Sequence, residues 1–220
     1  RQAARSKTSA ENRAYLTRSM APFEVLSTEG LETIEHAADT ILEEIGIDFR
    51  DYPSALTLLA DAGADVDGER VRFPRGMCRQ VIQASAPSTY TQHGRNPVRN
   101  VQVGGDATVL VPAYGSPFVR DLDEGRRYGT MADLEDLVKI NHTLEWTQHS
   151  GLVICEPTDV AVNKRHLDML ALHFQHSSKP PLGAITAPER ALDSIEMARI
   201  VFGTDRLDEH CVIMANINVN

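Results

Sequence analysis

The sequence lacks the long apolar runs and paired cysteines that mark membrane and disulfide-bonded proteins. No stretch approaches the roughly 18 consecutive apolar residues of a membrane span, and no apolar signal-peptide core lies near the first residue. The three cysteines (Cys78, Cys155 and Cys211) are scattered and form no CxxC pair, which is typical of free thiols in a reducing compartment. We therefore expect a cytoplasmic protein with no membrane partner.

Common catalytic and nucleotide-binding motifs are also missing. The chain contains no GxxxxGKS/T, no GxGxxG beside a predicted strand, no GxSxG and no HExxH. Aromatic residues make up 5% of the chain and the net charge is −9, so the body of the protein would repel nucleic acid. Residues 1–20 are the exception, because five basic residues there accompany a single acid. We interpret residues 1–30 as a basic arm that is either mobile or embraces a second subunit, and we expect a homo-oligomer.

The rest of the chain is organised around a repeat of apolar strands and helices. Apolar runs at 151–155, 181–185 and 211–216 start 30 residues apart, and an earlier run lies at 108–112. Unbroken apolar runs separated by a crossover helix are typical of parallel strands that are covered on both faces. Four such units fit half of a (β/α)8 barrel or the core of a doubly wound sheet, and the order of elements does not choose between them.

Helices are predicted between these runs from capping residues and apolar stripes. Thr130 and Asp133 are placed to cap the first helix, and Thr186 and Glu189 to cap the third. A small hairpin is expected within 121–129. The apolar stripes of the second and third helices comprise Leu167, Leu170, Ala171 and Phe174, and Leu192, Ile195, Ala198 and Phe202, respectively.

An α+β region precedes the repeat. The clearest helix, over 31–45, ends at Gly46, and two further helices are expected from Pro53 and from Pro74. Short strands are expected at 65–73, 89–93 and 98–103.

Seven short motifs occur in order between residue 31 and the last residue. They are Gly-Ile-Asp-Phe (46–49), Ala-Gly-Ala-Asp-Val-Asp-Gly (62–68), Val-Arg-Phe-Pro (71–74), Arg-Asn-Pro (95–97), Pro-Phe-Val-Arg-Asp-Leu-Asp (117–123), Arg-His-Leu-Asp (165–168) and Asn-Ile-Asn-Val-Asn (216–220). None is a catalytic signature by itself. Together they resemble the trimethylamine:corrinoid methyltransferase family, including its glycine betaine:corrinoid methyltransferase-like members that lack pyrrolysine.

The resemblance implies a TIM (β/α)8 barrel, of which about four β/α units are present, preceded by an α+β N-terminal cap. It divides the chain into the basic arm (1–30), the cap (31–107) and the first half of the barrel (108–220). Family members are longer, so residues 211–216 are expected to form an unpaired sheet edge. The position that holds pyrrolysine in some members cannot be matched to this chain.

The resemblance also implies a methyltransferase. It would move a methyl group from a methylated amine, trimethylamine or a quaternary amine such as glycine betaine, to the Co(I) corrinoid of a separate corrinoid protein. The corrinoid (cobalamin) belongs to that partner, and none is expected to be bound directly by this chain alone. The protein would hold, dehydrate and aim the amine.

Candidate substrate-binding residues are those expected after the strands, where β/α barrels carry their reactive groups. Tyr114 and Phe118 follow the first strand and could form an aromatic wall against a methylammonium group, a contact worth roughly 0.5 to 2 kcal/mol. Glu156 follows the second strand and could balance a cation or orient a neighbouring side chain. Asn216 and Asn218 follow the fourth strand and could bind a carboxylate or a corrinoid side chain. Each also has a structural interpretation: packing for the tyrosine, capping for the acid and loop hydrogen bonds for the amides.

No catalytic residue can be assigned from the sequence, and no metal site is predicted. His166, His173 and His176 have suggestive spacing but leave one helix in different directions. The remaining histidines are expected on the surface or in loops: His36, His93, His142, His149 and His210. Two other functions stay open. A different TIM-barrel enzyme would carry a metal or an acid pair in its mouth, and a non-catalytic half-barrel scaffold would bury Tyr114 and Asn216 in ordinary packing.

Overall fold

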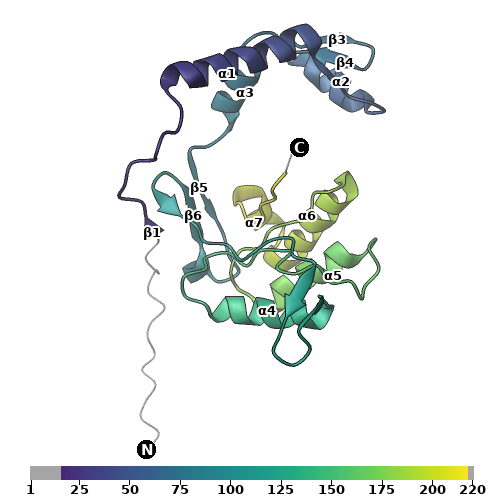
Figure 1. Ribbon diagram of the computed structural model, residues 1–220. Helices are drawn as coiled ribbons and strands as arrows, with labels where there is room; N and C mark the ends of the chain where they lie inside the picture. The colour runs from purple at the N-terminus through teal and green to yellow at the C-terminus, as the bar shows by residue number, and fades with distance from the viewer. Residues whose placement is uncertain (1–15, 218–220) are drawn as a thin grey trace, which may run out of the picture. The chain divides into compact units, whose positions relative to one another are not determined.

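A computed structural model of the chain describes residues 16–217, which form two units (Figure 1). One unit comprises residues 20–87, and the other comprises residues 16–19 together with residues 88–217. The first half of the predicted basic arm, residues 1–15, and Asn218 lie outside the described residues. The predicted division into an arm, a cap and half of a barrel uses other boundaries than these two units, and it stays a prediction. No helix within 16–217 is long and apolar enough to cross a membrane.

The unit of residues 20–87 combines helices with one small sheet. Its elements are α1 (Thr28–Thr40), the π-helical turn η1 (Ile41–Ile45), β2 (Ile47–Asp48), α2 (Pro53–Asp61), β3 (Asp65–Asp67), β4 (Arg70–Arg72) and α3 (Met77–Ser85). The strands pair antiparallel in the order β2-β4-β3. The three helices predicted here are confirmed, although α3 begins at Met77 and not at Pro74.

Gly46 ends the first helix, as predicted, because the backbone there has a φ of 74°. A Cβ atom added at Gly46 would lie 2.3 Å from the carbonyl oxygen of Val71, so only glycine fits between the helix and β4. Ala64, Val71 and Phe73 form the buried core of this unit. The sequence therefore specifies this helix-to-strand connection locally.

The second unit contains three antiparallel strand pairs and four α-helices. Its elements are β1 (Leu16–Thr17), β5 (Thr89–Gln92), the 3-10 turn η2 (Pro97–Arg99), β6 (Val101–Gly104), β7 (Ala107–Thr108), β8 (Phe118–Arg120), β9 (Arg126–Tyr128), α4 (Met131–Thr143), α5 (Arg165–His176), α6 (Pro188–Phe202) and α7 (Thr204–Glu209). β1 pairs with β7, β5 with β6 and β8 with β9. The last pair encloses the hairpin turn expected within 121–129, although β8 precedes that range, and the mixed α/β class is confirmed.

Three of the four apolar runs predicted as strands, 151–155, 181–185 and 211–216, are joined by single parallel bridges in place of continuous ladders, whereas the run at 108–112 takes part in none of them. The bridges are Ser116 with Cys155, Gly151 with Pro181, and Leu182 with Met214. Regular strand geometry within 108–112 is limited to Thr108, in β7. Pro180 and Pro181 have no backbone N–H to donate, which stops a ladder from extending there. The predicted parallel direction is nevertheless found at every bridge, and no closed barrel is formed by the residues that the structure describes.

β5 covers one end of the last parallel segment. Gln92 forms a parallel bridge with Cys211, and the His93 amide donates to the Cys211 carbonyl oxygen at 2.7 Å. The expectation of an unpaired edge over 211–216 is therefore wrong at its first residue. The buried Gln92 side chain also donates to the Pro181 carbonyl oxygen at 3.0 Å, so β5 ties two parallel segments together.

Two histidines are buried beneath these segments. His149 was expected on the surface or in a loop, but its side chain is fully buried and lies 2.9 Å from Gln92 Oε1. His173 accepts from the Ser150 hydroxyl at 2.6 Å and donates to the Leu152 carbonyl oxygen at 2.8 Å. Burial lowers the pKa of each histidine to about 4, so both rings are neutral at pH 7. Hydrogen bonds at both ring nitrogens make this burial possible.

The core lies between the parallel segments and the successive helices α4, α5 and α6 (Figure 1). The predicted cap of α4 is confirmed, because the Thr130 hydroxyl accepts from the Asp133 amide while the Asp133 carboxylate accepts from the Thr130 amide. In α5 the buried face is rotated from the predicted stripe, since Met169 and His173 are buried whereas Leu167 is only half-buried. The hydrogen bonds of His173 explain why a polar residue takes a core position.

The stripe predicted for α6 is wrong at Leu192, which is 67% exposed. The face turned to the core is formed by Ser194 and Ala198. Ser194 Oγ accepts from the Ala184 amide at 3.0 Å, and a Cβ atom added at Gly183 would lie 3.2 Å from Ser194 Cβ. Small side chains on both surfaces therefore allow α6 to approach the third parallel segment closely.

Candidate functional site

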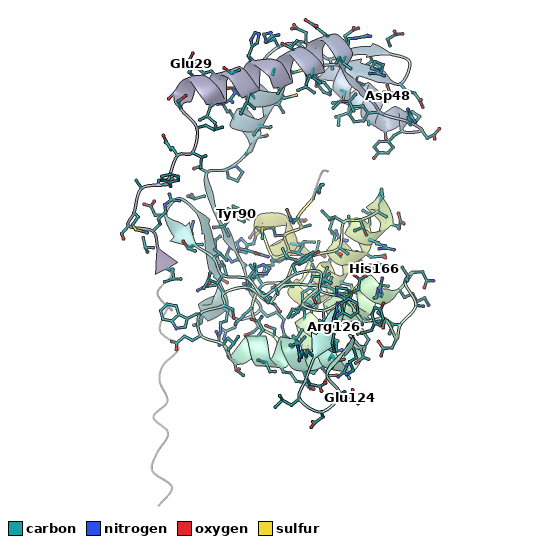
Figure 2. All side chains as sticks on the ribbon, in the orientation of Figure 1. Glu29, Asp48, Tyr90, Glu124, Arg126 and His166 are labelled. Carbon is teal, nitrogen blue, oxygen red and sulfur yellow. The ribbon has the colours of Figure 1, made fainter. Side chains whose placement is uncertain are left out.

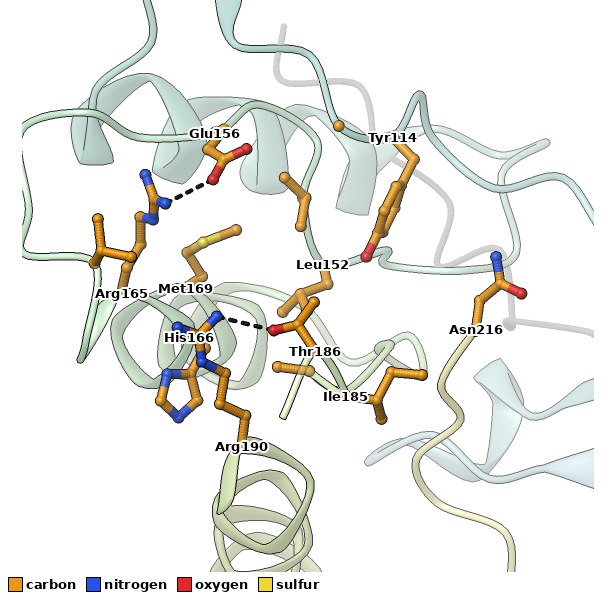
Figure 3. A pocket seen from close by; sticks show the side chains of 14 residues that line it. Tyr114, Leu152, Glu156, Arg165, His166, Met169, Ile185, Thr186, Arg190 and Asn216 are labelled. Atoms are coloured by element: carbon orange, nitrogen blue, oxygen red, sulfur yellow. Dashed lines mark hydrogen bonds and ion pairs between the residues drawn. The ribbon is translucent and has the colours of Figure 1, made fainter. Parts of the chain in front are cut away.

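A pocket of about 240 Å³ lies where the parallel segments end and α5 and α6 begin (Figure 3). The lining residues are Tyr114, Gly115, Leu152, Val153, Glu156, Val162, Arg165, His166, Met169, Ala184, Ile185, Thr186, Arg190 and Asn216. Pockets for drug-sized ligands are usually roughly 300–1,000 Å³, so this volume suits a small ligand. The side chains of Leu152 and Met169 are buried and give the pocket an apolar floor.

Tyr114 is held at the pocket by the loop that follows the first segment. The next residue, Gly115, has a φ of 79°, and its amide donates to the Val153 carbonyl oxygen at 2.8 Å. The Tyr114 side chain is 59% exposed, and Figure 3 shows its ring on the same side of the pocket as Asn216. Partial burial, and next the charge of Glu156, raise the pKa of the Tyr114 hydroxyl, so the phenol stays neutral.

Glu156 is positioned by backbone pairing and by an arginine. Its amide donates to the Ser116 carbonyl oxygen at 2.8 Å, which continues the bridge between the first two segments. Its carboxylate lies 2.7 Å from Arg165 Nη2, and Arg165 Nη1 donates to the Pro157 carbonyl oxygen at 3.0 Å. The acid is therefore neutralised by the first residue of α5.

Arg190 enters the pocket from the first turn of α6. The predicted capping box of this helix is wrong, because Ala187 is the cap residue and no side chain caps it. The Thr186 hydroxyl instead accepts from Arg190 Nη1 at 2.9 Å (Figure 3). Among residues 16–217, no carboxylate forms an ion pair with Arg190. The guanidinium is thus oriented by a neutral group and keeps its full positive charge.

His166 connects the two helices behind the pocket. Its Nε2 lies 2.8 Å from Asp193 Oδ2, so α5 and α6 are joined by a polar contact. Its Nδ1 is buried and has no hydrogen-bond partner. His173 contacts the parallel segments, as described above, whereas His176 lies 3.4 Å from Glu135. The three spaced histidines of α5 therefore have separate partners, and the described residues contain no group of three potential metal ligands.

Three of the predicted site residues, Tyr114, Glu156 and Asn216, line this one pocket. Phe118 is not a lining residue. It lies in the β8–β9 hairpin, with its ring 4.7 Å from that of Tyr128 and the guanidinium of Arg126 (labelled in Figure 2) 3.9 Å from its centre. Asn218 lies outside the described residues. The substrate-binding role of all five stays a prediction.

The sequence interpretation missed the two arginines of the pocket. Arg165 and His166 occur in the Arg-His-Leu-Asp motif, which was used only as a sign of family likeness. Arg190 lies four residues after Thr186, the spacing that places two side chains on one side of a helical turn. Attention to the first turn of each helix, in addition to the end of each strand, would have found both.

The fold and the pocket define an α/β protein in which the ends of parallel segments and the starts of the following helices surround a small, polar-rimmed pocket. Residues 1–220 match the family model described as trimethylamine methyltransferase (MTTB), and the chain belongs to this family. It is 38% identical over 197 residues to the glycine betaine methyltransferase of Desulfitobacterium hafniense (strain Y51). That match covers 89% of this chain and 41% of the relative, so the chain spans less than half of the relative's length.

Proposed function

We propose that this protein takes part in transferring a methyl group from a methylated amine to the Co(I) corrinoid of a partner corrinoid protein. The amine would be trimethylamine or a quaternary amine such as glycine betaine. The observation that carries the proposal is the placement of the Tyr114 ring and the Glu156 carboxylate on one small pocket of a chain in the trimethylamine methyltransferase family. An aromatic face and a carboxylate are the two groups that attract a methylated ammonium ion in proteins.

The proposal includes a TIM barrel, of which the parallel segments would form about four β/α units. Support comes from the parallel direction of the bridges and from the helices α4, α5 and α6, which alternate with the segments. In such barrels the active site lies at the carboxyl ends of the strands. The position of the pocket supports this proposal, since Glu156 directly follows the bridged residue Cys155 and Tyr114 lies two residues before its bridge partner Ser116.

For methyl transfer, the protein has to position and dehydrate the amine. When bound, the corrinoid supplies the Co(I) electron pair that accepts the methyl group. The carbon–nitrogen bond would break with its electron pair staying on nitrogen, so a quaternary amine would depart as a neutral tertiary amine. Trimethylamine would have to be protonated first in order to leave as neutral dimethylamine. Leu152 and Met169 give the amine an apolar floor, while Tyr114 and Glu156 face its charge. The exposed amide of Asn216 is suited to hydrogen-bond a polar side chain of the corrinoid at the open side of the pocket.

The two rival functions have less support from the pocket. A scaffold would bury Tyr114 in ordinary packing, but this side chain is 59% exposed. Glu156 is the single acid among the described lining residues, whereas hydrolysis by an acid pair needs two carboxylates facing one site. The methylated-amine site accounts for the exposed ring and the single acid together.

Calorimetric titration with trimethylamine, glycine betaine and choline tests the proposal. We expect saturable binding of at least one trimethylammonium compound and none of the neutral isostere of choline, in which carbon replaces nitrogen. Mixing the protein with a corrinoid protein reduced to Co(I) should then give an amine-dependent change in the corrinoid absorbance. Equal binding of choline and its neutral isostere, or no binding of any amine, would contradict the proposal.

A further inference from the structure

We propose that Arg190 is a specificity-determining residue that binds the carboxylate of a zwitterionic methylated amine, so that amines without an acid group are disfavoured. This inference rests on the proposed function and adds to it the substrate class and the residue that selects it. The supporting observation is the set of charged side chains that line the pocket, Glu156, Arg165 and Arg190.

The charges around the pocket do not balance. Glu156 and Arg165 form an ion pair at 2.7 Å, and together they contribute no net charge. Arg190 has no carboxylate partner among the described residues, and Asp193, on the same helix, lies 2.8 Å from His166 Nε2. With neutral histidine the lining residues therefore carry a formal charge of +1, which comes from Arg190.

A positively charged pocket disfavours a simple cation and favours a zwitterion. A trimethylammonium ion would bring a second positive charge close to Arg190, and like charges repel strongly where water is partly excluded. A betaine brings its own carboxylate, which neutralises the guanidinium while its ammonium group faces Tyr114 and Glu156. The net charge of the loaded pocket would then match that of the empty one.

The geometry suits a ligand with two different ends. In Figure 3, Arg190 and Tyr114 lie on opposite sides of the pocket, with Thr186 between them. The hydrogen bond to Thr186 uses one N–H of the guanidinium and restricts its orientation. The remaining N–H groups form a fork that matches a carboxylate, and such charge-assisted pairs are stronger than neutral hydrogen bonds. Arg190 is thus oriented before the ligand arrives.

The inference is tested with three probes: glycine betaine, choline and acetate. Choline shares the trimethylammonium group but carries a hydroxyl in place of the carboxylate, and acetate carries the carboxylate alone. Calorimetry on the full chain should give tighter binding of glycine betaine than of choline. Arg190→Met, which keeps an unbranched apolar stem, should weaken glycine betaine by about tenfold or more. The same variant should bind choline at least as tightly as the unsubstituted protein does, because the repulsion between the guanidinium and the ammonium group is removed. Acetate should compete with glycine betaine for the unsubstituted protein but not for this variant.

Two further variants control for charge and folding. Arg190→Lys should restore part of the affinity for glycine betaine, because the charge returns without the fork. Arg199→Met removes an arginine from the same helix, where it pairs with Glu196 outside the pocket, and should change neither ligand. Thermal unfolding of all variants shows whether a loss of binding reflects a loss of folding.

The outcomes separate this inference from the proposed function. If Arg190→Met weakens the binding of glycine betaine and of choline equally, Arg190 does not bind the carboxylate. The inference is then overturned, while the proposed amine site is not. If acetate binding depends on Arg190 but no trimethylammonium compound binds, the carboxylate role is supported and the proposed function is overturned. If the unsubstituted protein binds none of the three probes, both are overturned.

Discussion

Glu156 and Arg165 form an ion pair at 2.7 Å that joins the end of the second parallel segment to the first residue of α5. Both side chains line the candidate pocket, but they differ in exposure: Arg165 is 18% exposed and Glu156 is 41% exposed. The acid of the pocket is therefore neutralised before any ligand binds. Five predictions follow from this pair, from Tyr114 in the same pocket and from the polar groups that support the fold.

Replacing Glu156 with glutamine should weaken binding of a methylated amine several-fold, because Arg165 would lose its counter-charge and the lining residues would carry +2. Calorimetry at low and high salt should show a larger loss at low salt, since screening reduces the repulsion. Glu124→Gln removes the 67%-exposed partner of Arg127 in the hairpin and serves as the control. Unchanged affinity in Glu156→Gln would show that the acid serves only to orient Arg165.

Replacing Tyr114 with alanine should lower affinity for trimethylammonium ligands by roughly 0.5 to 2 kcal/mol, the usual range for a cation over an aromatic face. Tyr114→Phe should retain most of the affinity, because the phenol is neutral and the ring face supplies the attraction. Tyr128→Ala is a matched control, since Tyr128 is also 59% exposed but lies on β9 and does not line the pocket. Equal affinity of Tyr114→Ala and the unsubstituted protein in calorimetry would remove the tyrosine from the site.

Replacing Asp133 with asparagine should destabilise the fold by about 1–3 kcal/mol. Asp133 accepts two hydrogen bonds from Arg127, at 2.6 and 2.8 Å, as well as one from the Thr130 amide at 2.9 Å. Urea unfolding at pH 7 measures the loss. Asp136→Asn, on the same helix at a 76%-exposed position, should change stability little. Equal midpoints for the two variants would show that the capping box contributes nothing measurable.

The same carboxylate should give stability a dependence on acid pH. The hydrogen bonds from Arg127, and next those from Thr130, hold the pKa of Asp133 well below its usual range. A depressed carboxyl pKa stabilises the fold above the unfolded-state pKa, and this contribution is lost as the pH falls through the folded-state pKa. Asp133→Asn should therefore lose its difference from the unsubstituted protein under strongly acidic conditions.

His149 and His173 should make the protein less stable between pH 6.5 and pH 4. Burial lowers the pKa of each to about 4 from the ordinary 6.5, so the unfolded chain takes up protons in this range while the folded protein does not. The contribution is complete above pH 6.5 and declines as the pH falls, by an amount on the order of 3 kcal/mol for each histidine. Urea unfolding across this range should show the slope, and His173→Asn should flatten it. Identical slopes for the two proteins would exclude His173 as a source.

The sequence predicted correctly those helix ends and starts that are set by neighbouring residues. Gly46 ends a helix because of its positive φ, and the Thr130–Asp133 box begins α4, and both effects act within a few residues of the chain. The predicted faces of α5 and α6 were less accurate. Ser194 and His173 are buried because Ala184 and Ser150 offer them hydrogen bonds, and these partners are distant in sequence. Apolar periodicity cannot anticipate a polar residue that finds such a partner.

The sequence by itself determined the helices, the parallel direction of the segments, the family and three residues of the pocket, because these depend on short-range pattern and on motifs kept in order. Only the tertiary structure decided the charge of the pocket. Thr186 was assigned to a helix cap, yet it orients Arg190. Glu156 was expected to balance a cation or to orient a neighbour, and the structure shows that this neighbour is Arg165. Electrostatic pairing depends on distances of a few ångströms between side chains from different elements, and no spacing along the chain encodes those distances.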